Sequence, residues 1–471
     1  MKLDNTLTQN TTTRQSSILP PEIVREIVEH VSHDLTVDLP TRALNLLACS
    51  LVCSTWYNEV LPFVRRYFAW NQGVTMRLSD SNFHFLHSRL ADLLAESRRL
   101  HLAQCTFIIS LNIPLSTLIC QHSAEESTRQ DRKLSETYMK IIRNAPKLAY
   151  YRFTYDIDAV SDESGRDIDD FFNKAGPLCK AITHLELRQK SAEDLVTFNP
   201  CFIGSIADHL VYLRITGSLI GPARQALRLC YRLKIVRLNI VRFDLNWLVP
   251  LVASWPNLRV FIMHTDRPGL CDDGDEDSSA GQLALIEKLD PDLAAIIASP
   301  YPKKTVDDLI TALAASCHLL EDLNLRTRGL PYEKVSNGAM RGLIDSCFRT
   351  LKFLRIEGQT LYGDFLRDLT RCRQLKAIYL REYRDVVGGE LPPSLEELWP
   401  HLHFLRLSSC ASLEWAFIER VLLACGRLRM VELPWVLSEE REKFMAKIGF
   451  EKDNCGKTSP RNWRRASEPV L

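Results

Sequence analysis

One pattern of apolar and variable positions recurs along most of the chain: apolar, two variable residues, apolar, one variable residue, apolar. Eleven copies begin at residues 97, 148, 182, 210, 233, 258, 320, 351, 375, 402 and 428, for example LVYLRI, LKFLRI and LHFLRL. The last four positions of a copy alternate between variable and apolar residues, which predicts a short β-strand. Helix-like segments separate many of the copies: Val249–Trp255, Val306–Ala315, Met340–Cys347, Gly363–Cys372 and Trp415–Ala424.

A strand followed by a helix, repeated many times, stacks the strands into a curved parallel sheet with the helices outside it. The spacing of most copies resembles the leucine-rich repeat, whose period is roughly 20–29 residues. Two copies continue to a cysteine where that repeat often has one, at Cys105 and Cys410. The resemblance implies an α/β solenoid of leucine-rich repeats, in which the leucines of neighbouring repeats share one continuous core.

The chain of 471 residues exceeds one ordinary core, and the pattern divides it into regions. We expect a disordered lead at residues 1–16, a small all-α module at 17–66, and the solenoid at 67–437. A closing helix at Ser438–Lys447 and a disordered basic tail are predicted within residues 438–471. Insertions into the solenoid are expected near residues 106–146, 189–206 and 264–317. The last insertion contains the acidic run Asp272–Asp277, which lacks the alternation and terminal glutamate of a calcium loop.

Residues Ile18–Trp56 predict a helix, a loop and a longer helix. Pro21 suits a first helical turn, and apolar residues then recur at helical spacing on one face. A second apolar stripe runs from Leu44 to Trp56. So short a pair of helices cannot bury both stripes, and we therefore expect part of this apolar surface to bind a partner.

These residues also carry a family resemblance. Leu19-Pro20-x-Glu22-Ile23, followed by Leu51-Val52-Cys53-x-x-Trp56, is similar to an F-box, a helical module that docks on the Skp adaptor of a cullin–RING ubiquitin ligase. The connection Ser32–Thr41 departs from that family by being longer than its usual compact loop. An ordinary helical cap for the solenoid is the alternative. The resemblance implies that the adaptor is bound by Leu19, Pro20, Ile23, Ile27, Val28, Leu51, Val52, Cys53 and Trp56.

Composition narrows the classes of function. A formal net charge of +1 argues against bulk binding of nucleic acid or of anionic membranes. The first residues lack the apolar run of a signal peptide, and no segment is apolar and long enough to span a bilayer. Fourteen cysteines without an export signal predict reduced thiols in a cytoplasmic or nuclear protein. No catalytic motif, phosphate-binding glycine loop or zinc-ligand spacing occurs, so we expect neither an enzyme nor a cofactor or metal site.

Five cysteines share one position, three residues before the first apolar residue of a copy: Cys179, Cys230, Cys317, Cys372 and Cys425. Ala145, Trp255 and Trp399 take the same position in other copies. A ligand or nucleophile could not be exchanged for alanine or tryptophan. We therefore predict a buried packing position with unreactive thiols.

The variable residue between the last two apolar positions is expected to point away from the leucine core. Through the eleven copies this column reads His101, Arg152, Glu186, Arg214, Arg237, Ile262, Asn324, Arg355, Tyr379, Arg406 and Glu432. The position two residues further adds Arg188, Arg326 and Arg381. Guanidinium groups bind carboxylate and phosphate groups bidentately, so these arginines are predicted to bind an acidic or phosphorylated target on the concave face, together with Tyr379.

Two intramolecular alternatives compete with that prediction. Glu186, Glu357 and Glu432 lie in the same columns and could neutralise the arginines within the chain. The acidic insertion Asp272–Asp277 could also occupy the concave face as a built-in competitor of the target.

Taken together, the two resemblances imply the substrate-recognition subunit of an SCF-type ubiquitin ligase. The F-box would bind the Skp adaptor, and through it the cullin–RING ligase, while the repeats hold a target protein. This chain would then supply orientation, and the other subunits would perform the chemistry. Two alternatives remain: an interaction scaffold that does not engage the ubiquitin machinery, and a leucine-rich-repeat regulator of a small GTPase.

Overall fold

The structure is a computed structural model of the whole chain, and the residues that it describes form two compact units. One unit comprises residues 1–111 with 136–147, and the other comprises residues 112–135 with 148–471. The described residues are 19–34, 36–37, 39–52, 54–68, 83–100, 110–114, 118, 127–155, 162–189, 195–220, 222–239, 245–265, 304–327, 334–358, 360–381, 385–386, 398–407, 410, 413–452 and 462–465.

The N-terminal unit is helical. It contains α1 (Pro21–His33), α2 (Leu39–Cys49), α3 (Ser54–Phe68), α4 (Phe83–Arg99) and the end of α5 (Ser127–Asn144). α1 packs against α2 and α3, and α2 also packs against α4. The prediction of two helices is wrong, because the chain turns at residues 50–52 and the expected longer helix is divided into α2 and α3. The third helix completes a core in which Val24, Val28, Leu44, Leu47 and Val60 are fully buried.

The connection between α1 and α2 is shorter than the sequence suggested. Ser32 and His33 still belong to α1 and α2 starts at Leu39, so only residues 34–38 connect the helices. The Arg42 guanidinium donates hydrogen bonds to the carbonyl oxygens of Ser32 (3.3 Å) and Val37 (2.8 Å). One side chain of α2 therefore contacts both ends of this turn. The predicted long loop at Ser32–Thr41 is wrong, because both of its ends belong to helices.

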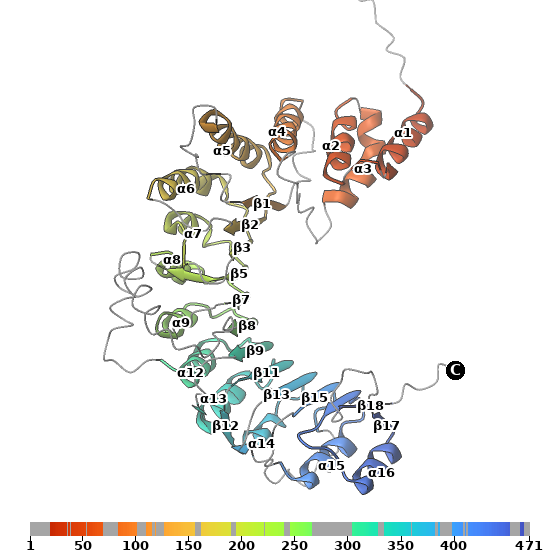
Figure 1. Cartoon of the computed structure of the whole chain (residues 1–471), viewed down its shortest axis with the longest axis vertical. Coiled ribbons are helices and arrows are strands. Elements are labelled where there is room, and N and C mark those ends of the chain that lie inside the picture. The colour runs from red at the N-terminus through yellow and green to blue at the C-terminus, as the bar shows by residue number, and fades with distance from the viewer. Residues whose placement is uncertain are drawn as a thin grey trace, which may run out of the picture. The chain divides into compact units, whose positions relative to one another are not determined.

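In the described part of the chain, thirteen strands form one sheet (Figure 1). Neighbouring strands from β2 to β16 pair in parallel, which confirms the predicted stack of repeats. In spatial order the strands are β1 (Ser110–Pro114), β2 (Tyr150–Tyr155), β3 (His184–Gln189), β5 (Tyr212–Thr216), β7 (Ile235–Asn239), β8 (Val260–Thr265), β9 (Asp322–Thr327), β11 (Phe353–Glu357), β13 (Ala377–Arg381), β15 (Phe404–Arg406), β16 (Met430–Glu432), β18 (Asn462–Arg465) and β17 (Phe450–Lys452).

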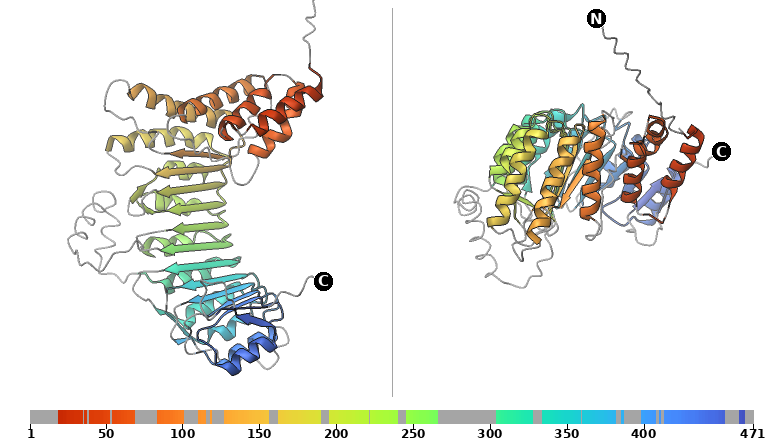
Figure 2. Two further views of the ribbon diagram at one scale, coloured as in Figure 1. Left: turned by 45° about the vertical axis from the view of Figure 1, so that its right-hand side comes forward. Right: turned by 90° about the horizontal axis from the view of Figure 1, so that it is seen from above.

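Helices line one side of this sheet, as the views in Figure 2 also show. They are α6 (Asp162–Ala175), α7 (Pro200–Ile206), α8 (Pro222–Ala226), α9 (Leu245–Val252), α12 (Val306–Ser316), α13 (Asn337–Cys347), α14 (Phe365–Leu369) and α15 (Trp415–Ala424), with 3₁₀ turns η3 (Gly176–Leu178) and η4 (Leu227–Leu229). Small sheets extend some repeats: β4 (Leu195–Thr197) with β6 (Ser218–Ile220), and β10 (Lys334–Val335) with β12 (Thr360–Gly363) and β14 (Asp385–Val386). The sheet and its helices form the α/β solenoid that leucine-rich repeats predict.

Local signals explain where several helices begin. Thr305 precedes α12, and its hydroxyl accepts a hydrogen bond from the backbone N–H of Asp308, while the Asp308 carboxylate accepts one from the backbone of Thr305. This capping box satisfies two backbone donors that a helix start leaves unpaired. The predicted helix at Val249–Trp255 is α9, which starts earlier, at Leu245, and ends at Val252.

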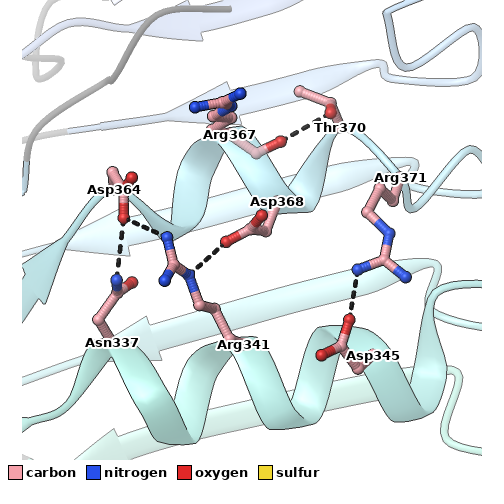
Figure 3. Close-up of polar contacts among 8 residues, drawn as sticks. All are labelled: Asn337, Arg341, Asp345, Asp364, Arg367, Asp368, Thr370 and Arg371. Carbon is pink, nitrogen blue, oxygen red and sulfur yellow. Dashed lines mark hydrogen bonds and ion pairs between the residues drawn. The ribbon is translucent and has the colours of Figure 1, made fainter.

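Polar side chains also link successive repeats on the helical side (Figure 3). The Arg341 guanidinium of α13 contacts Asp364 (2.8 Å) and Asp368 (2.6 Å) of the next repeat, and the Asn337 amide donates to Asp364 (2.9 Å). These contacts fix the distance between α13 and α14, while the leucines between them supply the buried area.

The first copy of the pattern, which begins at residue 97, does not form the predicted strand. Ser97–Arg99 form the last turn of α4 instead of a strand, and the first strand of the sheet is β1, from Ser110. Leu90, Leu94 and Ser97 are buried at helical spacing, so helix packing determines this segment. His101 and Cys105 lie outside the described residues.

The C-terminal end also differs from the prediction. The predicted closing helix is confirmed as α16 (Glu439–Lys447), but part of the tail that we expected to be disordered forms β18. β18 pairs antiparallel with β16 on one side and with β17 on the other, and it buries Trp463. An open end of a parallel sheet exposes unpaired backbone groups, and this antiparallel hairpin covers them. Arg461 and the acidic run Asp272–Asp277 lie outside the described residues.

Within the described ranges, no helix combines the length and the apolar character needed to cross a membrane.

Candidate interaction surfaces

An apolar row lies on the outer side of α1. Leu19, Ile23 and Ile27 follow one another at intervals of four residues, and they are 42%, 42% and 37% exposed. Side chains four residues apart lie on one face of a helix, so Ile23 and Ile27 are neighbours on α1, and Leu19 precedes the N-cap residue Pro20. We call these three exposed side chains the apolar strip. Val24 and Val28 face the opposite way and are fully buried. Val28 therefore belongs to the core of the module, which corrects its assignment to the adaptor-binding surface.

The remaining predicted adaptor contacts differ in exposure. Pro20 and Val52 are exposed, Val52 by 62%, whereas Leu51 and Trp56 are half-buried. Cys53 lies outside the described residues. An ion pair of 2.8 Å between Arg25 and Glu59 joins α1 to α3. The exposed strip is thus carried by a braced helix, and this geometry suits the docking of another apolar surface.

The second surface is the face of the solenoid sheet opposite to its helices, which we call the open face. Three outward rows of side chains line it, and the central row is the column predicted from the sequence. Strand register aligns Arg152, Glu186, Arg214, Arg237, Ile262, Asn324, Arg355, Tyr379, Arg406 and Glu432 from β2 to β16. The predicted alignment is therefore confirmed, while the binding role of these side chains stays a prediction.

One carboxylate neutralises two arginines near the start of the open face. Glu186 lies 2.7 Å from Arg152 and 3.1 Å from Arg188, and its side chain is almost fully buried. Burial opposes ionisation of Glu186, but hydrogen bonding to Tyr150 and the charges of both arginines outweigh it and lower the pKa of the carboxyl group. We call this arrangement an Arg–Glu–Arg clip.

A second clip lies in the later repeats. Glu357 is fully buried, 2.6 Å from Arg355 of the same strand and 3.4 Å from Arg326 of the neighbouring strand. Further along, Arg406 pairs with Glu432 across β15 and β16. The intramolecular alternative is therefore confirmed for Arg152, Arg188, Arg326, Arg355 and Arg406. The side chain of Arg381 lies outside the described residues, although its backbone aligns with Glu357.

Arg214 and Arg237 differ from the other described arginines of the open face. They lie directly opposite each other on β5 and β7, and neither forms an ion pair with any described carboxylate. The Arg237 guanidinium lies over the Tyr212 ring, 5.9 Å from its centroid. Burial raises the pKa of Asp322, two strands away, and the charge of Arg237 partly counteracts that rise. Two like charges on adjacent strands destabilise a sheet unless something offsets them.

The row beside the central one is largely aromatic and apolar. Tyr150, His184 and Tyr212 stack in sequence, with ring centroids 5.8 Å and 5.3 Å apart. Ile235 and Val260 continue this row as half-buried side chains. This row was not predicted from the sequence. The signal was available, because each of these residues occupies the first variable position of its predicted strand.

The shared cysteine position is a packing position, as predicted. Cys179, Cys230, Cys317, Cys372 and Cys425 are buried free thiols, and Ala145, Trp255 and Trp399 are buried at the same place in their repeats. Burial raises the pKa of Cys179 to about 11 and that of the other four thiols to about 12. No three His, Cys, Asp or Glu side chains in the described part of the chain come together to hold a metal ion.

No protein-family model and no curated protein matches the chain. One similar structure is the leucine-rich-repeat ectodomain of the plant membrane receptor kinase GASSHO1/SCHENGEN3 from Arabidopsis thaliana, at 15% identity and a TM-score of 0.31. That match covers 57% of this chain and 25% of the ectodomain, so this chain spans about a quarter of the ectodomain's length.

Two further structures match over more of their length. The complex of Rad7 and Elc1 in yeast matches at 11% identity and a TM-score of 0.35, covering 88% of this chain and 93% of that chain. An internalin from Listeria monocytogenes matches at 11% and 0.35, with 76% and 99% covered. At these identities and TM-scores, the fold assignment rests on the strand register and the buried leucine rows of this chain.

Proposed function

We propose that this protein is the substrate-recognition subunit of an SCF-type ubiquitin ligase, with the helical module bound to the Skp adaptor and the open face bound to a target protein. The observation that carries the proposal is the strip of Leu19, Ile23 and Ile27 on a module whose core is already complete. Apolar side chains left exposed in a row, beside a filled core, favour a partner surface over an internal role. The chain itself positions the target, and the partner subunits perform ubiquitin transfer.

The structure supports this proposal in two further ways. The short, braced turn between α1 and α2 removes the main departure of the sequence from the F-box pattern. The strip also supplies binding free energy, because burying each partly exposed side chain contributes about 1–2 kcal/mol. The solenoid offers a separate surface on the open face, so adaptor and target would use different parts of the chain.

Co-purification tests the proposal. The full chain, expressed with the Skp adaptor and a cullin, is expected to capture both. Replacing Leu19→Ala together with Pro20→Ala, or Ile23→Glu alone, should abolish capture without unfolding the protein, because these side chains are exposed. Leu229→Ala, which removes an exposed leucine from the solenoid, is the matched control and should leave capture unchanged.

Two outcomes would contradict the proposal. Capture of the adaptor by the Leu19→Ala, Pro20→Ala variant at the level of the parent would show that the strip is not the docking surface. Failure of the parent chain to capture the adaptor would favour the interaction scaffold, in which the solenoid binds proteins outside the ubiquitin machinery.

A further inference from the structure

Charge is distributed unevenly along the open face. The outward rows of β2, β3, β5, β7 and β8 carry four arginines against one glutamate, a surplus of three positive charges. The described outward side chains of β9 to β16 carry three arginines against three acidic residues, and therefore no surplus. Among the described outward side chains of β2 to β16, the surplus of positive charge therefore lies on β2 to β8.

The two clips show how this sheet holds a carboxylate. In each, a buried glutamate bridges two arginines, one on its own strand and one on the neighbouring strand. Arg214 and Arg237 form a third pair of neighbouring arginines, but no described carboxylate bridges them. The acid that aligns with Arg214 on the other side is Glu186, which the first clip already uses.

Apolar surface adjoins this pair. Tyr212 and Ile235 precede Arg214 and Arg237 by two residues on the same strands, so their side chains lie about 7 Å away along the strand direction. Tyr212 ends the ring stack that begins at Tyr150. In an extended peptide, side chains two residues apart are separated by the same distance of about 7 Å. A peptide lying along these strands would therefore place one side chain on each row.

We infer that Arg214 and Arg237 bind the carboxylate of an aspartate or glutamate in an extended target peptide, while an aromatic side chain two residues away packs on Tyr212 and Ile235. The inference rests on the proposed function, since it specifies the target of the open face. Bidentate hydrogen bonds from the two guanidinium groups orient the carboxylate, and the ring stack selects the aromatic residue.

A peptide array tests the inference with the full chain. The probes are extended nonapeptides that carry Glu and Phe two residues apart, with matched members that have Gln, Lys or phosphoserine in place of Glu. The parent chain should retain Glu members at least tenfold more tightly than Gln members. The Arg214→Glu, Arg237→Glu variant should lose this preference and retain the Lys members instead, because its charges are reversed.

A matched control separates this site from general electrostatics. Arg228 and Arg232 are exposed residues of η4 and the turn before β7, so Arg228→Glu with Arg232→Glu makes the same change in net charge in the same repeat. That control should bind the Glu members as the parent does. Equal retention of Glu and Gln members by the parent, retention of no member, or unchanged binding by the Arg214→Glu, Arg237→Glu variant would overturn the inference. Phosphoserine members bound more than tenfold above Glu members would overturn the carboxylate assignment.

Adaptor capture, measured on the same proteins, keeps the two proposals distinguishable. The Arg214→Glu, Arg237→Glu variant should capture the Skp adaptor as the parent does. Peptide selectivity without adaptor capture would contradict the ligase proposal but not the peptide site. Adaptor capture without peptide selectivity would contradict the peptide site but not the ligase proposal.

Discussion

Replacing Glu357→Gln tests whether the Arg–Glu–Arg clips stabilise the solenoid. The Glu357 side chain is 1% exposed, and one of its oxygens accepts hydrogen bonds from Nη2 (2.6 Å) and Nε (3.0 Å) of Arg355. Its other oxygen lies 3.4 Å from Nε of Arg326. Glutamine keeps the shape and one acceptor oxygen but removes the negative charge that both arginines share.

The expected change in the free energy of unfolding depends on how exposed the two arginines are to solvent. Removing one partner of a fully buried ion pair costs about 3–5 kcal/mol, because the other charge stays buried and unpaired. Here Arg326 and Arg355 are 26% and 32% exposed, so partial hydration reduces that cost. We therefore expect Glu357→Gln to lower the free energy of unfolding by about 2 kcal/mol.

Urea titration of the full chain, combined with hydrogen exchange of the β9 and β11 amides, measures this loss. Exchange is needed because a repeat array can open locally before it unfolds globally. Glu439→Gln is the control: its pair with Lys443 is 83% and 75% exposed, so the change should stay within about 0.5 kcal/mol. If both variants lose the same small amount, the buried clip contributes no more than a surface pair, and the reasoning is refuted.

Two further predictions concern burial. Thiol reagents at pH 8 should modify the exposed Cys201 within minutes but spare Cys230 and Cys372. Burial raises the pKa of both buried thiols to about 12, which leaves a thiolate fraction on the order of 10⁻⁴. Equal modification rates in the native protein would contradict this prediction, and equal rates in denaturant are the control. Trp463→Ala should lower the local free energy of unfolding by about 3–5 kcal/mol and speed amide exchange in β16, since a buried ring is lost from β18. Unchanged exchange would show that β18 does not protect the sheet edge.

Much of the solenoid could be predicted because its constraint is local and repeated. Each copy needs apolar residues at fixed places, so the alignment of Arg214 with Arg237 follows from counting along the chain. The interchange of Cys372 and Trp399 at one position likewise predicted a buried place. These conclusions depend on alternation within a strand, which a sequence displays directly.

Other features depend on contacts that no local pattern encodes. Ser97–Arg99 fit the repeat pattern, yet tertiary packing of α4 makes them helical. Trp463 lies in a short polar segment that becomes a strand only because β16 offers an unpaired edge. Which arginines are neutralised also depends on rotamers: the sequence places Glu186 beside Arg214, but the carboxylate bonds Arg152 and Arg188 instead.

The unpaired charges of Arg214 and Arg237 lead to a last prediction: a carboxylate added within the chain should stabilise the solenoid and at the same time block peptide binding at this pair. Thr216 follows Arg214 by two residues on β5, as Glu357 follows Arg355 on β11. Thr216→Glu should therefore supply a carboxylate to Arg214, raise the free energy of unfolding by about 1 kcal/mol, and abolish selection of Glu peptides on the array. Thr216→Gln, which is similar in size and uncharged, should do neither. A Thr216→Glu variant that still selected Glu peptides would show that the pair does not bind the carboxylate, since an intramolecular carboxylate at a high effective concentration would have displaced it.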